Sequence, residues 1–187
     1  MSRSPIVTAL LDANVLYPAP LRDYLLHLAS LRVFEPMWTA TIQEEWIRNL
    51  LEARPDIKRA ALEATQRAMD IAFPGANITG YEFRIEGLSL PDPNDRHVLA
   101  AAIKGEAQVI VTANLKDFPI ATLAPFRIQA IHPDEFVSAC IDRDRHKAIK
   151  ALNKQVKALK NPPLPLEKVL NNLESTGLVK SVAKLKS

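Results

Sequence analysis

The apolar residues of this chain fall into short runs that alternate with amphipathic segments. Five runs are short, rich in β-branched residues and bounded by turn residues, which is typical of buried strands. They cover residues 6–11, 33–38, 81–85, 108–114 and 126–131. Between them, apolar residues recur with the spacing of helices that bury one face, over residues 21–31, 41–53, 57–73 and 96–107. We therefore expect an α/β fold in which a parallel sheet of about five strands is covered by helices on both faces.

Local signals refine the boundaries of these elements. Pro36 lies inside the second apolar run, which predicts an edge strand or a bulge because proline cannot donate to a sheet. Thr39 is a candidate N-cap for the helix that follows it. Pro55 and Asp56 are expected to begin the next helix, and Gly105 to end the one after that. The segment 12–20 is expected to form a turn.

From about His132 the pattern changes to helices alone, predicted at 134–141, at 144–160 and after the prolines that follow Asn161. Residues 142–187 hold 11 Lys or Arg against four Asp or Glu, whereas residues 1–141 hold 13 against 17. A basic segment can meet phosphates or an acidic partner, although a solvated basic face without a ligand is as common. The long helix combines an apolar stripe (Ile149, Leu152, Val156, Leu159) with a lysine face (Lys147, Lys150, Lys154, Lys157, Lys160).

Composition excludes several classes of protein. No apolar run reaches the roughly 20 residues of a membrane-spanning helix, and the single cysteine, Cys140, can form no internal disulfide. No Cys/His pair has zinc spacing. With no apolar span and no disulfide pair, we expect a cytoplasmic protein, and we expect Cys140 to be a packed helix residue. Trp38 and Trp46 are expected in the core rather than stacked on a nucleic-acid base, and His97 is expected to pack on the buried face of its helix.

Polar residues gather where three of the predicted strands end. Asp12 and Asn14 follow the first strand, Thr112, Asn114 and Asp117 follow the fourth, and Asp92, Asn94 and Asp95 follow the third. Each acid alone could be a turn former or a helix cap. Parallel strands, however, open their carboxyl ends into one crevice, and a cluster of carboxylates is costly unless a cation lies between them. Glu44 and Glu45 could point into the same crevice.

These residues also carry a resemblance. LLDANVLYPAPLRDYLLHLA, WTATIQEEWIRNL and LPDPNDRHVLAAAIKGEAQVIVTANLKDFP, in this order, are similar to the motifs of the PIN-domain nucleases, and most similar to VapC-type toxins of bacterial type II toxin–antitoxin systems. The resemblance covers residues 6–131. The sequence beyond 134 is similar to the helical extension of one VapC subgroup. Together these similarities imply a PIN-like three-layer α/β/α domain at 1–133 and a basic helical extension at 134–187.

The resemblance also implies roles for the acids. The first acid of the family falls on Asp12, the second on Glu45 rather than Glu44, and the third on Asp95, with Asp92 as its support. The fourth acid is Asn114 here. Either Asp117 replaces that acid, or Asn114 holds a water of the metal.

The implied chemistry is hydrolysis of RNA with Mg²⁺ or Mn²⁺. One or two ions would lie at Asp12 and Asp95. Glu45 would help to orient the metal-bound water or would bind a second ion, and Asp117 is a further candidate ligand. Asn14, Thr112 and Asn114 would hydrogen-bond to the water shell or the phosphate, while Arg96 would meet a neighbouring phosphate or stay solvated. The implied partners are an RNA substrate, a cognate antitoxin and a second copy of the chain. We expect the tail to fold onto the body and to strengthen RNA binding rather than to supply catalysis.

One other function remains as an alternative, and two more fit the sequence poorly. The Asn114 substitution would be compatible with a PIN fold that has lost catalysis and binds RNA or protein. A receiver-like signalling domain also gathers acids at strand ends, but it needs a Lys after its fifth strand, where this chain has HPDEF. A flap nuclease of related fold would be larger and would carry more acids.

Overall fold

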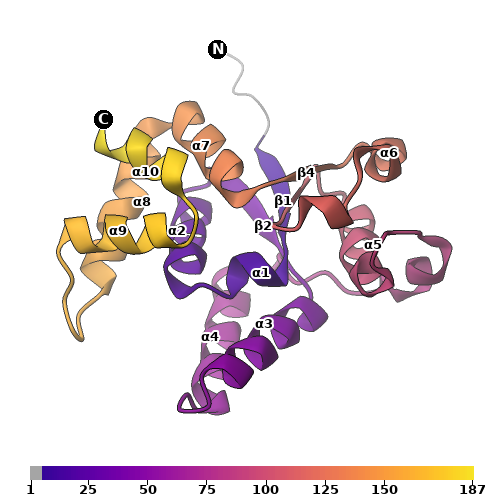
Figure 1. The fold of residues 1–187 in the computed structure, drawn as a ribbon, viewed down its shortest axis with the longest axis horizontal. Coiled ribbons are helices and arrows are strands. Elements are labelled where there is room, and N and C mark those ends of the chain that lie inside the picture. Colours follow the sequence, from indigo (N-terminus) through magenta and orange to yellow (C-terminus); the bar gives the residue numbers. More distant parts are fainter. Residues whose placement is uncertain (1–5) are drawn as a thin grey trace.

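A parallel sheet lies at the centre of the molecule, and helices cover it on both sides (Figure 1). The structure, a computed structural model, describes residues 6–187. The strand order is β2-β1-β3-β4, and every pair is parallel. The strands are β1 (Val7–Leu11), β2 (Phe34–Met37), β3 (Val109–Val111) and β4 (Gln129–Ile131). The α/β class is therefore confirmed, with four strands instead of about five.

The third predicted strand is wrong. Residues Glu82–Gly87 form a 3₁₀ helix, and no residue of it is buried. Phe83 is 73% exposed, whereas Tyr81 is buried and its hydroxyl lies 3.0 Å from the Thr41 hydroxyl. Apolar and polar residues alternate at 81–85, which predicted a strand. This alternation covers too few positions to distinguish a strand from a turn. Gly80, with a φ of 71°, helps to turn the chain before this segment.

Helices make up most of the remaining chain. In order they are α1 (Ala13–Leu16), α2 (Ala19–Ser30), α3 (Ala40–Ala53), α4 (Arg59–Ala72), α5 (Arg96–Lys104), α6 (Ile120–Leu123), α7 (Pro133–Arg143), α8 (Arg145–Ala158), α9 (Leu166–Ser175) and α10 (Val179–Lys186). Two expectations need correction. The segment 12–20 holds a short helix, α1, and the start of α2 rather than a plain turn, and α4 begins at Arg59 rather than beside Pro55.

The local signals at β2, α3 and α5 are confirmed. Pro36 lies in β2, which is an edge strand. The Thr39 hydroxyl accepts a hydrogen bond from the Ile42 amide and caps α3. Gly105 ends α5 where a Cβ would lie only 2.7 Å from the sulfur of Met37, so a side chain here would require the Met37 and Ile78 side chains to move. These caps fix how α3 and α5 meet the sheet.

The C-terminal helices pack against α2, on the left of Figure 1. The Tyr24 hydroxyl donates to the Ala148 carbonyl oxygen at 3.1 Å, and the Gln155 amide donates to the Pro20 carbonyl oxygen at 3.0 Å. The buried face of α8 is one position away from the predicted stripe: of that stripe only Leu152 is buried, and the face is completed by Ala148, Ala151 and Gln155. The hydrophobic core runs without interruption from the sheet into these helices.

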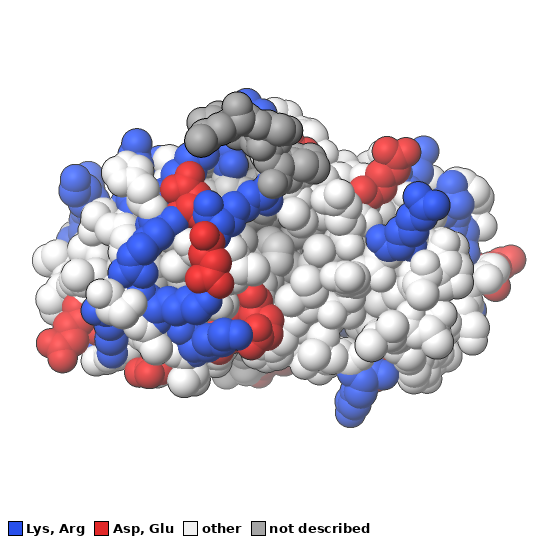
Figure 2. Space-filling model, turned by 90° about the horizontal axis from the view of Figure 1, so that it is seen from above, with Lys and Arg blue, Asp and Glu red and all other residues white. Residues whose placement is uncertain are grey.

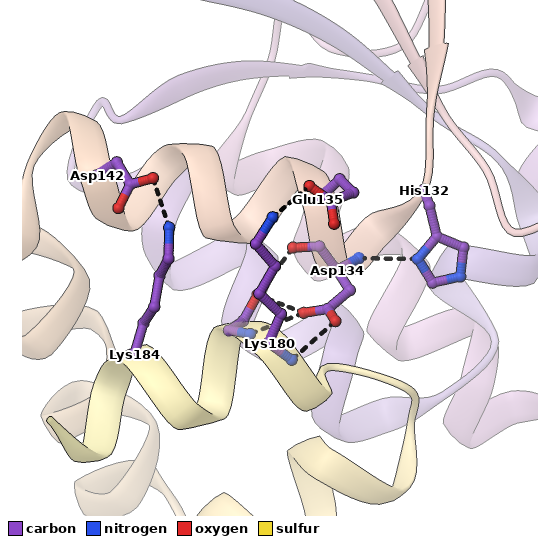
Figure 3. Close-up of polar contacts among 7 residues, drawn as sticks. His132, Asp134, Glu135, Asp142, Lys180 and Lys184 are labelled. Carbon is purple, nitrogen blue, oxygen red and sulfur yellow. Dashed lines mark hydrogen bonds and ion pairs between the residues drawn. The ribbon is translucent and has the colours of Figure 1, made fainter.

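The α7–α10 contact is held by charged and polar side chains, drawn in Figure 3. Asp134 accepts hydrogen bonds from the Lys180 amide and from both the amide and the hydroxyl of Ser181. Asp134 therefore caps the start of α10 from α7. Lys180 and Lys184 form ion pairs with Glu135 and Asp142, respectively.

Candidate carboxylate crevice

Asp12 lies at the carboxyl end of β1, between two neighbouring strands. Its side chain is only 5% exposed. One carboxylate oxygen accepts from the Ala13 amide at 2.8 Å. The other accepts from the Thr112 hydroxyl at 2.8 Å and from the Asn14 amide at 3.0 Å. The position of this carboxylate is thus fixed by donors from two strand ends.

Asn14 and Thr112 join the loops that follow β1 and β3. The Asn14 amide nitrogen also donates to the Thr112 hydroxyl at 3.2 Å, and its oxygen accepts from the Ala113 amide at 3.0 Å. The Thr112 hydroxyl in turn accepts from the Asn114 amide at 3.1 Å. Four predicted site residues therefore meet in one network, although Asn114 takes part through its backbone and is exposed.

Glu45 lies on α3 and forms an ion pair with His97 on α5, with Nε2 and Oε1 2.8 Å apart. The other ring nitrogen of His97, Nδ1, is buried and has no hydrogen-bond partner among residues 6–187. Glu44 points elsewhere and pairs with Arg59 at 2.6 Å in an exposed position. The geometry thus supports the choice of Glu45 over Glu44 and gives His97 a polar contact that sequence reasoning missed.

Asp95 is half-buried where the 3₁₀ helix Pro93–Asp95 runs into α5. Its pKa is raised to about 6, first by burial and then by the negative charges of Asp12, Asp92 and Asp117, while His97 opposes the rise. No side-chain hydrogen bond caps α5 at Asp95. A half-buried carboxyl that faces other acids is strained electrostatically unless it is protonated or meets a cation.

The other predicted residues on these loops differ in their contacts. Asp92 accepts from the Asn94 amide at 2.9 Å and caps the 3₁₀ helix, so its capping interpretation is confirmed. Arg96 turns back and donates to the Pro93 carbonyl oxygen at 3.0 Å. Asp117 is half-buried at the end of a second 3₁₀ helix, Leu115–Asp117.

Burial acts on Asp12 as it does on Asp95. The pKa of Asp12 is raised, chiefly because the carboxyl is removed from water; hydrogen bonds from Thr112 and Ala13 oppose this rise, and the charge of Glu45 adds to it. The acids of β1, α3 and α5 are therefore close enough to affect one another. Among residues 6–187, however, no three of the Asp, Glu, His and Cys side chains come together closely enough to form a ready-made metal site.

The donor set still fits a hard divalent cation. Asp12 is held in place by donors, and its Ala13-bonded oxygen retains lone pairs. The charge of Asp12 raises the pKa of Asp95, so the two acids lie within electrostatic reach, and both offer oxygen, the ligand atom that Mg²⁺ and Mn²⁺ prefer. The chemistry of these side chains therefore suits such an ion, with further oxygens supplied by water.

The aromatic and sulfur-containing residues considered from sequence do not join this site. Trp38 and Trp46 are fully buried, which confirms that they are core residues. The Arg22 guanidinium lies 4.5 Å from the centre of the Trp46 ring and donates to the Leu16 carbonyl oxygen. Cys140 is buried in α7, as expected.

Comparisons with known proteins agree with this geometry. A family model described as "PIN domain" matches residues 8–116, and one described as "VapC50 C-terminal domain" matches residues 133–187. The chain belongs to the PIN domain family and joins this domain to a VapC50-type C-terminal region. The PIN-domain resemblance, including the VapC-type extension, is thus confirmed.

One curated relative gives a more particular comparison. The protein described as "Putative ribonuclease VapC50" from Mycobacterium tuberculosis (strain ATCC 25618 / H37Rv) is 42% identical over 79 residues. The match covers 42% of this chain and 47% of the relative, so the chain spans about half the length of the curated relative that it matches. No solved structure matches the chain. Among residues 6–187, no helix has both the length and the apolar character needed to cross a membrane.

Proposed function

We propose that this protein is a divalent-metal-dependent endoribonuclease and the toxin of a toxin–antitoxin pair. The observation that carries the proposal is the buried Asp12, which is held by Thr112 and Asn14 at the end of a central strand and lies within electrostatic reach of Asp95. Asp12 also caps the short helix α1, but this cap does not explain why Asp95 lies nearby, where the charge of Asp12 opposes its ionisation. A cation and a phosphate substrate would explain why both are present.

Asp12 and Asp95 would hold the Mg²⁺ or Mn²⁺ ion. Bound there, the ion would activate water and neutralise negative charge on the phosphate. Thr112 and Asn14 keep the Asp12 carboxylate in one orientation. Glu45, which pairs with the His97 Nε2 atom, would accept a proton from the attacking water. The water oxygen would bond to phosphorus as the bond from phosphorus to the ribose oxygen breaks, and the leaving oxygen would take up a proton from solvent.

Asp117 is our candidate for the fourth acid in place of Asn114. The charge of Asp117 raises the pKa of Asp95, so the two carboxyls lie within electrostatic reach. The Asn114 side chain is exposed and makes no hydrogen bond with residues 6–187, whereas its amide supports Thr112. Arg96 is bound to the Pro93 carbonyl oxygen and would have to turn to reach a phosphate.

The partners and location follow the same proposal. A VapC-type toxin would act on RNA in the cytoplasm and would be restrained by a cognate antitoxin. The exposed apolar side chains of Ile120 and Phe126, near the edge strand β4, supply area for a homodimer contact. We also propose that the PIN-like domain covers residues 1–133 and the helical extension residues 134–187. The two parts share one hydrophobic core.

An RNA cleavage assay tests the proposal. The purified protein should cut labelled single-stranded RNA with Mg²⁺ or Mn²⁺ and should stop when the metal is chelated. The same ions should raise its melting temperature, since a hundredfold excess over Kd stabilises by about 2.7 kcal/mol. The alternative is a catalytically impaired PIN-fold binding module, which the Asn114 substitution favours. Binding of RNA without cleavage under every metal condition would support that alternative.

A further inference from the structure

The lysines of the C-terminal helices belong to two groups with different contacts. Lys180 and Lys184 on α10 are neutralised by acids of α7 (Figure 3). Figure 2 shows acidic side chains between the basic ones over the C-terminal helices, on the left of that view. On α8, by contrast, no carboxylate of residues 6–187 forms an ion pair with Lys150, Lys154 or Lys157.

These three lysines line one open hollow on the surface of α8. The hollow has a volume of about 430 Å³ and is lined by residues of α8 alone: His146, Ile149, Lys150, Asn153, Lys154 and Lys157. We call it the α8 groove. The spacing of the lysines, at i, i+4 and i+7, places them on one face of α8 over about 10 Å of helix. The Lys154 ammonium reaches only the Ser30 hydroxyl, at 3.5 Å.

The neighbouring groups do not neutralise these lysines. His27 on α2 has a pKa that is lowered first by burial and second by the charge of Lys154, so its ring is neutral at pH 7 and adds no charge of either sign. The acid nearest in sequence, Asp144, forms an ion pair with Lys147 at 3.8 Å and caps α8. An unneutralised row of ammonium groups in a groove attracts a polyanion.

The lining favours nucleic acid over protein as the occupant. Ile149 is its only large apolar side chain, and it is half-buried. Protein interfaces are anchored by buried aromatic or aliphatic side chains and are depleted in lysine. Binding to phosphates, in contrast, depends on lysine and arginine through the release of counterions.

We propose that the α8 groove binds the phosphate backbone of single-stranded RNA, outside the carboxylate crevice. The choice of RNA as the polyanion rests on the proposed nuclease function. The groove would hold a flanking part of the substrate by its charge, with no reading of sequence. It would therefore matter for long RNA and not for a fragment that fills only the crevice.

A pair of matched double variants tests this assignment in the full chain. Lys150→Gln/Lys157→Gln removes two unpaired charges, and Lys180→Gln/Lys184→Gln removes two paired ones, so the net charge changes equally. Binding of a long labelled RNA is measured by fluorescence anisotropy with a chelator present, which prevents cleavage, over a range of salt concentrations. The first variant should bind about ten-fold more weakly, with a log–log salt slope shallower by about 1.4, or about 0.7 for each lost phosphate contact. The second should keep the wild-type slope. Adding Lys154→Gln to the first should lower the slope again.

Several results would overturn the assignment. Equal losses in both variants would mean that only net charge matters, and unchanged binding in the first would mean that the groove does not meet RNA. Loss of binding to a glutamate-rich peptide alone would assign the groove to an acidic protein segment. Cleavage of a short RNA with Mg²⁺ separates the two proposals. If the wild type cleaves and the α8 variant binds long RNA normally, only the groove assignment fails; if nothing is cleaved but the variant binds weakly, only the nuclease proposal fails.

Discussion

The carboxylate crevice and the α7–α10 contact differ in the partners of their acidic side chains. In the crevice, burial and neighbouring acids raise the pKa of both Asp12 and Asp95. In the α7–α10 contact, burial also acts to raise the pKa of Asp134, but hydrogen bonds from Ser181 and Lys180 outweigh it, and the pKa is lowered. In the first region, therefore, acids lie near other acids. In the second region, the acids of α7 bind hydrogen-bond donors or lysines of α10.

This difference separates a binding site from a structural contact. Hydrogen bonds that favour an ionised group in the folded state stabilise the fold at neutral pH. A repulsive cluster does the opposite, and it becomes favourable only when something outside the chain supplies the missing positive charge. The contrast predicts that substitutions in the crevice change activity, whereas those in the α7–α10 contact change stability.

The largest effect is expected for Asp12→Asn. The amide keeps the shape but loses the charge that would hold a divalent ion, so cleavage should fall by about a thousandfold, or about 4 kcal/mol. The control is Asp56→Asn, which makes the same change at an exposed acid paired with Arg54. Initial rates on short RNA, with circular dichroism to verify folding, provide the measurement. Wild-type cleavage by folded Asp12→Asn would remove the crevice from the mechanism.

The second effect is expected at Asp134. Asp134→Ala removes three hydrogen bonds to the start of α10, so the free energy of unfolding should fall by about 2 kcal/mol. Asp142→Ala, which breaks only an exposed ion pair with Lys184, should cost about 0.5 kcal/mol. Urea unfolding measures both. Short-RNA cleavage by folded Asp134→Ala should stay near the wild-type rate, and a large loss would break the division between the two regions.

His97 shares features of both regions, because it is packed in the fold and also contacts Glu45, a candidate site acid. His97→Leu should lower kcat about ten-fold by freeing Glu45, as substitutions behind functional ligands commonly do. His97→Gln places an amide donor near the former Nε2 position and should restore most of the rate. If both variants are equally slow at equal stability, the histidine does not act through Glu45.

The smallest effect concerns the pH dependence of stability without metal. The folded-state pKa of Asp95 is raised from 3.8 to about 6, so the stability that its protonated form contributes is present below about pH 4 and is lost as pH rises through 6. After allowance for solvent screening this loss is about 1 kcal/mol. Urea unfolding in chelator at pH 4 and pH 7 should show a smaller loss in Asp95→Asn than in the wild type, because Asp12, whose pKa is also raised, still titrates in the variant. Equal losses in both proteins would mean that Asp95 does not contribute.

Features set by local sequence could be predicted. The position of Asp12 at the end of a central strand follows from the residues directly before it, Ala9–Leu11, which are apolar and buried. Thr39 and Gly105 were placed correctly at helix ends because capping depends on neighbouring residues only. The strand predicted at 81–85 failed because its short alternation had no partner strand to stabilise it.

Features set by the meeting of distant elements could not be predicted. The pairing of Glu45 with His97 depends on how α3 and α5 approach each other, and no spacing in the sequence encodes that distance. The same holds for the lysines of the C-terminal helices, which look alike in sequence. Their acids come from α7, so only the packing of α10 on α7 distinguishes Lys180 and Lys184 from Lys150 and Lys157.

The packing of α8 on α2 also has a consequence in time. Tyr24 and Ala148, which bond to each other, are 124 residues apart in the chain. At about 5 to 20 residues per second, a ribosome makes α8 about 6 to 25 seconds after α2. During that interval the side of α2 that α8 will cover has no permanent neighbour. The shared core therefore closes only late in synthesis, after the last strand, β4, has been made.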